Sequence, residues 1–329
     1  MKQLFKKEKY NIGIIGATGL VGRSLINELE KVHIDIDNLY LFGSKKSINK
    51  KIKFKNKFYN VNEFTKEYYD FIDIFFFCST NEISRYHIPF LLNKPCLIID
   101  NSSEFRLIEN VPLVIPELNF NIVKNKKLIC NPNCSTIQSV MILGIIDKFY
   151  NIRKIIYNTY QAVSGSGIDG VIDYYHNKRK VYYYNIKDTC IPVIGKLTKN
   201  NHTTEEEKMI LETKKILKKN LIIDATCIRV PILIGHGVSV YIEVKKNINI
   251  EDIKTKLSSY QNIVILDDVN NNIYPTSINT FDNSKIYVGR FKIVNKNSLS
   301  FYICANNLLT GAASNSVNIC LKYLENLKT

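Results

Sequence analysis

The first third of the chain alternates between short apolar runs and segments in which apolar residues recur at helical spacing. The run Tyr10–Ile15 predicts a buried strand that ends at a glycine-rich turn, and residues 24–31 predict the helix after it. Further strands are predicted over residues 38–42, 71–78 and 96–100, and a helix over residues 83–92. This alternation is typical of a parallel sheet.

The pattern changes after residue 130. A helix is predicted over residues 139–146, strands over 153–162, 224–230 and 238–244, and a hairpin over Ile286–Asn295 and Ser298–Ala305. Residues 311–327 again show helical spacing. We therefore expect an α/β protein with a Rossmann-type nucleotide-binding domain over residues 1–130 and a mixed α/β domain over 131–305. A C-terminal helix, within residues 306–329, is expected to return to the first domain.

Composition narrows the classes of protein that remain. The 329 residues are 45% hydrophobic and 23% charged, as in ordinary globular proteins. No window is apolar enough for a membrane helix and no secretion signal is visible, so we expect a cytoplasmic protein. The net charge of +15 comes from scattered lysines, which favours attraction of small anionic substrates over nucleic-acid binding.

The eight cysteines form no C-x-x-C pair and no histidine cluster accompanies them, so no metal site is predicted. In a reducing compartment most of them are expected to be buried small apolar residues.

The turn after the first strand is Gly16-Ala-Thr-Gly-Leu-Val-Gly22. Glycines between a strand and a helix allow close approach of a pyrophosphate to the helix N-terminus. The alternative is a tight turn without a ligand. The second strand ends in Gly43-Ser-Lys-Lys-Ser47 rather than in an acidic residue, and these cations and hydroxyls suit a phosphate. The sequence therefore predicts NADP rather than NAD.

The segment Cys130-Asn-Pro-Asn-Cys-Ser-Thr136 places Cys134 at the start of a helix. Pro132 ends the preceding strand, and the free N–H groups of a helix start favour a thiolate. A thiolate is the nucleophile needed to attack a carbonyl or an acyl phosphate. The alternative is a buried cysteine with a packing role only.

A cysteine nucleophile needs a partner that handles protons. Of the five histidines, His236 stands apart because it lies at a turn between two predicted strands. The run Tyr160-Gln-Ala-Val-Ser-Gly-Ser-Gly167 is a strand that enters a glycine-rich loop, which either holds a nicotinamide ring or merely turns the chain.

Taken together, these stretches resemble the bacterial type of aspartate-semialdehyde dehydrogenase, a family that reduces β-aspartyl phosphate to aspartate β-semialdehyde in lysine, methionine and threonine biosynthesis. The resemblance covers almost the whole chain. Besides the motifs above, it rests on the following stretches: Asp100-Asn-Ser-Ser-Glu-Phe-Arg106, Glu205-Glu-Glu-Lys208, the segment 229–236 and Asn306-Asn-Leu308. The spacings of 27 positions from Cys134 to Gln161 and seven from Arg229 to His236 make the match specific.

The resemblance implies roles for individual residues. Cys134 would form an acyl-thioester, Gln161 would position it and His236 would be the general acid/base. Substrate would be bound by Arg106, Asn133, Gln161, Glu205, Lys208 and Arg229, with the guanidinium of Arg229 on the α-carboxylate, Glu205 on the α-amino group, and Lys208 and Arg106 on the phosphate. NADP would contact Gly16, Thr18, Gly19, Leu20, Val21, Lys46, Ser47, Ser164, Gly165 and Asn307. A homodimer or homotetramer would form through the second domain.

The sequence departs from the family pattern at two places. Lys46 stands where the family usually has arginine, and Asn306-Asn-Leu-Leu-Thr-Gly311 replaces the usual Asp-Asn-Leu-Arg-Lys-Gly. These changes bear on the cofactor side rather than on the thioester chemistry.

Three alternatives stay open. Residues 205–217 form an amphipathic pattern, so Glu205 and Lys208 could simply face water. N-acetyl-γ-glutamyl-phosphate reductase shares the fold and the cysteine–histidine chemistry, although its acylated amine would give Glu205 no positive charge to meet. A non-catalytic dinucleotide-binding or nucleic-acid-binding protein would need no thiolate at a helix start.

Overall fold

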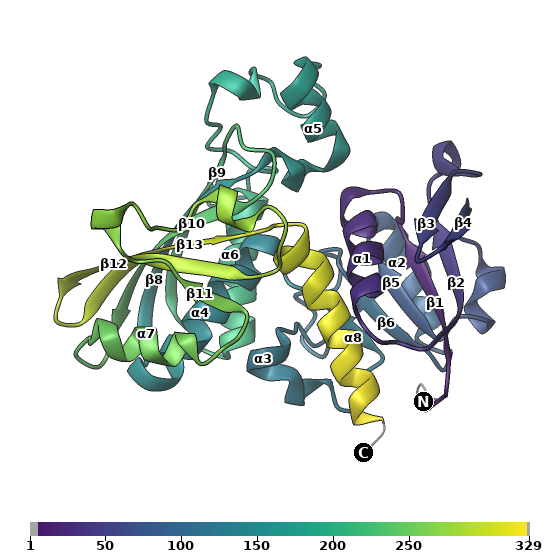
Figure 1. Cartoon of the computed structure of the whole chain (residues 1–329), viewed down its shortest axis with the longest axis horizontal. Coiled ribbons are helices and arrows are strands. Elements are labelled where there is room, and N and C mark those ends of the chain that lie inside the picture. Colours follow the sequence, from purple (N-terminus) through teal and green to yellow (C-terminus); the bar gives the residue numbers. More distant parts are fainter. Residues whose placement is uncertain (1–5, 328–329) are drawn as a thin grey trace. The chain divides into compact units, whose positions relative to one another are not determined.

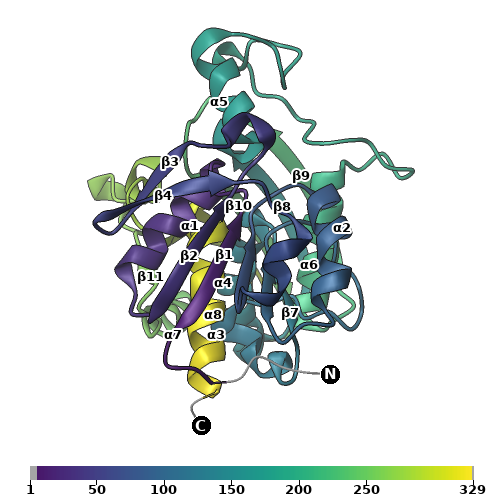
Figure 2. The same ribbon diagram turned by 90° about the vertical axis from the view of Figure 1, so that its right-hand side faces the viewer.

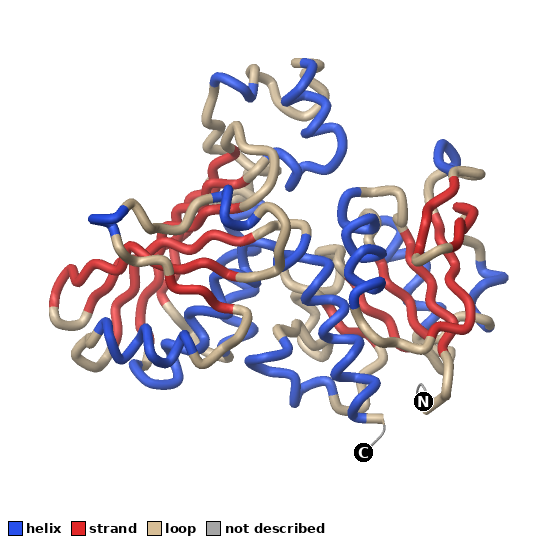
Figure 3. Tube along the Cα trace, in the orientation of Figure 1, coloured by secondary structure: helices blue, strands red, loops and turns tan. Residues whose placement is uncertain are grey.

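The computed structural model describes residues 6–327 and divides the chain into two compact units. The first unit comprises residues 1–132 and 312–329, and the second comprises residues 133–311. Each unit has one sheet with helices packed on it, as the cartoon and the trace show (Figures 1 and 3). The expected domain boundaries lay at residues 130 and 305. Residues 306–311 fall with the second unit because Gly311 N–H donates to the carbonyl of Asn306, whose side chain binds the carbonyls of Thr280 and Phe281.

The first unit contains a seven-stranded sheet in the order β3-β4-β2-β1-β5-β6-β7. Its strands are β1 (Tyr10–Ile15), β2 (Ile36–Phe42), β3 (Lys51–Phe54), β4 (Lys57–Asn62), β5 (Ile74–Phe77), β6 (Leu97–Asp100) and β7 (Leu128–Cys130). All pairs are parallel except the β3–β4 hairpin. Because β2 and β5 lie on opposite sides of β1, the strand order reverses there, which is where open parallel sheets bind ligands.

Helices cover both faces of this sheet, so its central strands are mostly apolar and β5 is entirely so. Helices α1 (Leu20–Lys31) and α8 (Ser314–Asn326) share one hydrophobic cluster with the sheet, and α2 (Asn81–Leu91) packs into the other (Figure 2). The short helix α3 (Pro116–Asn119) lies between β6 and β7 along the chain. The expected return of the C-terminal helix to the first unit is confirmed.

The second unit contains a six-stranded mixed sheet in the order β11-β12-β13-β10-β8-β9. Its strands are β8 (Ile152–Gln161), β9 (Ile222–Arg229), β10 (His236–Val244), β11 (Ile263–Ile265), β12 (Ile286–Asn295) and β13 (Ser298–Ala305). Helices α4 (Cys134–Tyr150), α6 (Thr204–Leu217) and α7 (Ile250–Ser258) cover one face, and α5 (Gly167–His176) follows the loop after β8. The two-domain α/β fold expected from the sequence is confirmed.

Helix α4 is the central element of the second unit. Thirteen of its seventeen residues are buried, so it is apolar on nearly all sides rather than amphipathic. It ends at Tyr150, and the left-handed backbone of the C-cap residue Asn151 (φ 56°) reverses the chain directly into β8. Helix and strand therefore run antiparallel, and the start of α4 lies at the edge of the sheet where β8 ends. No helix within residues 6–327 is long and apolar enough to cross a membrane.

Candidate active site

Four strands of the second unit bring distant residues to one edge of the sheet. Strands β8 and β9 are parallel and end side by side, with Gln161 paired to Arg229. Strand β10 runs antiparallel to β8 and starts at His236, which pairs with Ala305 at the end of β13. Hydrogen-bonding register alone thus gathers Gln161, Arg229 and His236 at the edge where α4 begins.

The start of α4 is built around Asn133. Its side-chain oxygen accepts hydrogen bonds from the N–H groups of Ser135 (3.0 Å) and Thr136 (3.4 Å), as an N-cap residue does. Cys134 is therefore the first residue of the helix, and it is half-buried. Of the other seven cysteines, five are buried, Cys78 is half-buried and Cys190 is exposed, so the expectation of mostly buried cysteines fits.

The carboxylate of Glu205, from α6, joins three of the predicted site residues. Its Oε1 accepts hydrogen bonds from Asn133 Nδ2 (2.8 Å) and Gln161 Nε2 (3.3 Å), and its Oε2 meets Lys208 Nζ at 3.1 Å. Burial alone would raise the pKa of this carboxyl. The ammonium of Lys208, the Asn133 hydrogen bond and the charge of Arg229 outweigh burial and lower the pKa to about 2. Glu205 is thus an anion buried inside the site rather than a charge facing water.

His236 is fully buried and electrically neutral. Burial, aided by the nearby charge of Arg229, lowers the pKa of its imidazole to about 3. Its Nδ1 accepts a hydrogen bond from the Ala162 N–H (3.0 Å), so the neutral ring carries its proton on Nε2. That Nε2 has no hydrogen-bond partner among residues 6–327. A buried donor is therefore left available for an oxygen atom of a ligand.

Arg229 is held by the same loop. Its Nη1 donates to the carbonyl of Ala162 (2.6 Å), whereas its buried Nε has no partner among residues 6–327. A cavity of about 610 Å³ opens beside it, bounded mainly by residues 181–184 and 189–195. One side of the guanidinium is thus fixed by protein, and Nε stays free to donate to an anion.

The glycine-rich loop after β8 lies directly over His236 and Arg229. An added Cβ at Gly165 would approach Arg229 Nη1 to 2.6 Å and His236 Nε2 to 3.2 Å. Ser164 is bound to Asn307 Nδ2 (2.9 Å), and Asn307 Oδ1 also accepts from the Gly235 N–H (2.9 Å). Asn307 therefore ties the loop after β8 to the loop before β10.

The first unit contains a cavity of about 750 Å³ around the ends of β1, β2 and β5. Gly16, Thr18 and Gly19 line it, and Leu20 and Val21 form the first turn of α1. Gly16 and Gly22 are required, because a Cβ would come within 2.3 Å of the Cys78 carbonyl oxygen at Gly16 and within 2.2 Å of the Gly16 oxygen at Gly22. Helix α1 has no side-chain cap and no acidic residue in its first turn. These features fit a dinucleotide pyrophosphate.

Three other predicted residues lie in the first unit. Ser47 is buried and its hydroxyl accepts from Thr18 (3.2 Å), whereas Lys46 is exposed and its neighbour Lys45 lines the cavity together with Lys66 and Glu63. Arg106 is buried in the loop after β6, where Nη2 donates to the Asn101 carbonyl (2.6 Å). These residues belong to the first unit, whereas the cluster around Cys134 belongs to the second.

Sequence reasoning missed several residues of the cluster. Gln138, one turn after Cys134, donates to the carbonyl of His236 (3.0 Å), and Gly311 packs against the Cβ of Cys134. Glu212 accepts from the Asn133 N–H (2.7 Å). One signal was available: Glu205 and Glu212 are spaced like the buried Met209 and Ile216 on one face of α6, where an acidic residue is out of place.

The comparisons with known proteins agree with this arrangement. A semialdehyde dehydrogenase NAD binding domain matches residues 11–126, and a semialdehyde dehydrogenase dimerisation domain matches residues 142–310. Aspartate-semialdehyde dehydrogenase from Campylobacter jejuni is 34% identical, over 97% of this chain and 98% of its own length. The enzyme of the same name from Bacillus subtilis is 37% identical, over 94% of this chain and 96% of its own length. The chain belongs to the aspartate-semialdehyde dehydrogenase family.

A solved structure supports the same assignment. Aspartate semialdehyde dehydrogenase II from Vibrio cholerae, complexed with ASA, superposes with a TM-score of 0.90 at 30% identity, covering 95% of this chain and 98% of that one. Membership of the aspartate-semialdehyde dehydrogenase family makes the chain an NAD(P)-dependent oxidoreductase. The alternative reductase for N-acetyl-γ-glutamyl phosphate is not favoured.

Replacing Gly311 with alanine is expected to move the cysteine. The new Cβ would lie 2.6 Å from the Cys134 Cβ and 3.0 Å from its Cα, so helix α4 must shift at its first residue. Misplacement of a reacting group by about 1 Å can cost roughly 10²-fold in rate. The rate at which iodoacetamide alkylates Cys134 measures this displacement. Thr310→Val, in the same turn as Gly311, is the control. Alkylation of Gly311→Ala at the unmodified rate would contradict the expectation.

The neutrality of His236 predicts how stability depends on pH. The unfolded chain binds a proton at this histidine below its ordinary pKa of 6.5, whereas the folded chain binds it only near 3. Stability is therefore expected to fall as pH decreases from about 6.5 towards 3. Urea unfolding at several pH values should show a shallower decline for His236→Asn than for the unmodified protein. The same change at exposed His33 serves as the control, and equal slopes in all three proteins would contradict the assignment.

Proposed function

We propose that the chain reduces β-aspartyl phosphate to aspartate β-semialdehyde, reversibly and with NADPH, through a thioester on Cys134. The observation that carries this proposal is the cluster around Asn133 and Glu205, in which a helix-start cysteine lies beside a buried anion and near a buried neutral imidazole and a guanidinium. Each charged group of the substrate finds a group of opposite charge. The V. cholerae relative, complexed with ASA, supports the same substrate class.

The unpaired groups of the site suggest how the substrate binds. The free Nε of Arg229, with the neighbouring Nη2, suits bidentate pairing to the α-carboxylate, since Nη1 is already held by Ala162. The anionic Glu205 suits the α-ammonium group, which an acylated amine lacks. Lys208 and Arg106 are assigned to the phosphate. Lys208 would exchange part of its pairing with Glu205 for the phosphate oxygens.

The chemistry then follows from the residues of the chain. The thiolate of Cys134 attacks the acyl carbon, the S–C bond forms, and the C–O bond to phosphate breaks. Gln161 holds the acyl group, while the Nε2–H of His236 donates to its carbonyl oxygen as negative charge develops there. When bound, NADPH supplies the hydride that reduces the thioester. The S–C bond then breaks, and Cys134 is released as thiolate with the aldehyde. Reducing chemistry at a free thiol is consistent with a cytoplasmic enzyme.

The cofactor is assigned as NADP. The glycine turn and the first turn of α1 suit the pyrophosphate. Thr18 and Lys45 line the same cavity, Ser47 is hydrogen-bonded to Thr18, and Lys46 is next to Lys45 in the chain; these four residues are assigned to the ribose phosphate of NADP. Ser164, Gly165 and Asn307 are assigned to the nicotinamide end. Of these, Asn307 acts by fixing Ser164 through its hydrogen bond.

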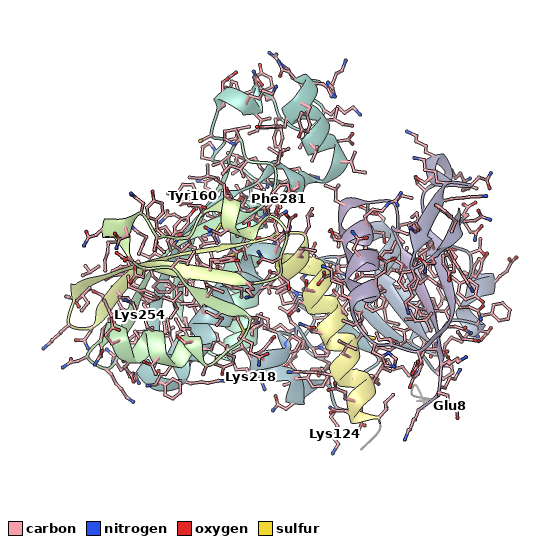
Figure 4. The ribbon with its side chains drawn as sticks, in the orientation of Figure 1. Glu8, Lys124, Tyr160, Lys218, Lys254 and Phe281 are labelled. Atoms are coloured by element: carbon pink, nitrogen blue, oxygen red, sulfur yellow. The ribbon has the colours of Figure 1, made fainter. Side chains whose placement is uncertain are left out.

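The dimer is assigned to the open face of the second sheet. Helix α4 contacts both α6 and α7, so all three lie on one face. The opposite face exposes Ile222 and Tyr160, whose ring lies beside that of Tyr302. Figure 4 shows Tyr160 on this side and Lys254 of α7 on the other. A family model named for dimerisation covers this unit.

Charge favours a second copy of the chain as the occupant of this face. Arg290 and Lys292 of β12 line a cavity of about 370 Å³ near one edge of the sheet, and exposed Asp224 of β9 lies at the other edge. In a dimer with twofold symmetry, Arg290 and Lys292 of each copy can face Asp224 of the other copy.

An assay with purified protein tests the proposed reaction. Aspartate β-semialdehyde, phosphate and NADP should produce NADPH, whereas N-acetylglutamate γ-semialdehyde should produce little. Cys134→Ser should reduce turnover by about 10⁴-fold or more, because the hydroxyl is a far weaker nucleophile than a thiolate. NADP binding should persist in this variant. Turnover only with the acetylated substrate, or full activity without Cys134, would overturn the proposal.

Charge reversal near the glycine turn tests the cofactor. Lys45→Glu and Lys46→Glu should each raise the Michaelis constant for NADP about 10-fold or more and leave that for NAD nearly unchanged, because a charge-assisted bond to phosphate is lost. Lys50→Glu, in the same loop but after the short turn Lys45–Ser47, is the matched control. Equal Michaelis constants for NADP in all of these variants would count against an NADP site here.

Sedimentation measures the assembly. The double change Arg290→Glu with Lys292→Glu should convert dimer to monomer, and adding Asp224→Lys should restore the dimer by exchanging the two charges. Lys218→Glu, at the end of α6 on the helix-covered side, is the control. A dimer unaffected by the double change would place the interface elsewhere.

A further inference from the structure

We propose that Glu212 is a positioning residue of the reaction, which holds the backbone at the start of α4 and thereby places the nucleophile. The inference rests on the proposed function of Cys134. Glu212 lies in the middle of α6, is only 1% exposed, and its Oε2 accepts a hydrogen bond from the Asn133 N–H at 2.7 Å.

Asn133 is the residue on which the cysteine depends. It immediately precedes Cys134, and its extended backbone (φ −60°, ψ 148°) gives way to helix at the next residue. The N–H of Asn133 is the backbone donor directly before the nucleophile. The preceding residue, Pro132, has no N–H and therefore cannot replace it. A buried donor of this kind must be satisfied, and Glu212 satisfies it.

Helix α6 holds Asn133 at two points. Glu205 accepts from the side-chain amide of Asn133, and Glu212, two helical turns later, accepts from its backbone N–H. The first contact orients the amide so that its oxygen caps Ser135 and Thr136, and the second fixes the peptide that leads into Cys134. With only one of these two contacts, Asn133 could rotate about the contact that remained.

A carboxylate strengthens this hold. Hydrogen bonds from an N–H to an ionised acceptor are shorter and roughly twice as strong as neutral ones, and 2.7 Å is at the short end of their range. Packing alone does not require an acid here, since the neighbouring positions Met209 and Ile216 on the same face are apolar. The contact with Asn133 gives this acid a role at the helix start of α4.

Three variants of the full-length protein separate this role from a structural one. Glu212→Ala removes the acceptor, and Glu212→Gln keeps an oxygen acceptor without charge. Thr213→Val is a matched control at the next buried position, where the hydroxyl bonds to the Met209 carbonyl and to Tyr157. The measurements are kcat and KM for aspartate β-semialdehyde, the rate of Cys134 alkylation by iodoacetamide, and thermal unfolding.

For Glu212→Ala we expect kcat to fall about 10²-fold, as for a slightly misplaced reacting group. KM should change less than about 3-fold, because Arg229, which is assigned to the α-carboxylate, is held by the Ala162 carbonyl and not by Glu212. Alkylation of Cys134 should slow as well. Glu212→Gln should recover most of both rates, and Thr213→Val should match the unmodified protein. Two results would overturn the proposal: unmodified rates in folded Glu212→Ala, or rates in Glu212→Gln as low as those of the alanine variant.

A further variant covers the case in which Glu212→Ala does not fold. Glu212→Asp keeps the charge but withdraws it by one methylene, so alkylation and kcat should fall while the fold persists. Unmodified rates in this variant would also overturn the proposal. Alkylation needs no substrate, so it tests Glu212 even if the unmodified protein proves inactive with aspartate β-semialdehyde, a result that would sink only the proposed function.

Discussion

The second unit depends on one buried interaction, the contact of Glu205 with Asn133. An ionised carboxylate inside a protein is costly unless several donors surround it, and here Asn133, Gln161 and Lys208 do so. The same contact fixes which end of the Asn133 amide faces helix α4. The N-cap of the nucleophile's helix, the end of strand β8 and a surface cation are therefore coupled through a single carboxylate.

The sheet makes this arrangement stable. Gln161, Arg229 and His236 occupy paired positions at the ends of three hydrogen-bonded strands, so their backbones cannot shift independently. The loops that carry no regular structure are tied down as well, because Asn307 bridges the loops that precede and follow these strands. A site built on strand ends and braced loops needs little reorganisation when charge develops in it.

Much of this was accessible from the sequence, and the exceptions have physical causes. Strand β1 and the β12–β13 hairpin lie where the apolar pattern put them, whereas α1 and α4 begin four and five residues earlier than expected. Their first turns contain glycine or polar residues, which carry no apolar periodicity. Cys134 and His236 could be singled out by their place at element ends. For Glu212 the one signal was an acidic residue on the apolar face of α6, and for Gln138 there was none, because their roles lie in contacts with residues 79 and 98 positions away.

Arg229 links the two titrating groups of the site. Its charge contributes to lowering the pKa of both Glu205 and His236, but with opposite consequences, since it favours the charged form of the carboxyl and the neutral form of the imidazole. Of these three groups, around neutral pH, Glu205 is a fixed anion, Arg229 a fixed cation and His236 a neutral donor. A substrate carboxylate bound to Arg229 would offset the positive charge of the guanidinium. The Arg229 charge would then lower the pKa of His236 less, so the imidazole would become more basic. The substrate itself would thus bring His236 closer to the protonation range in which it can transfer a proton.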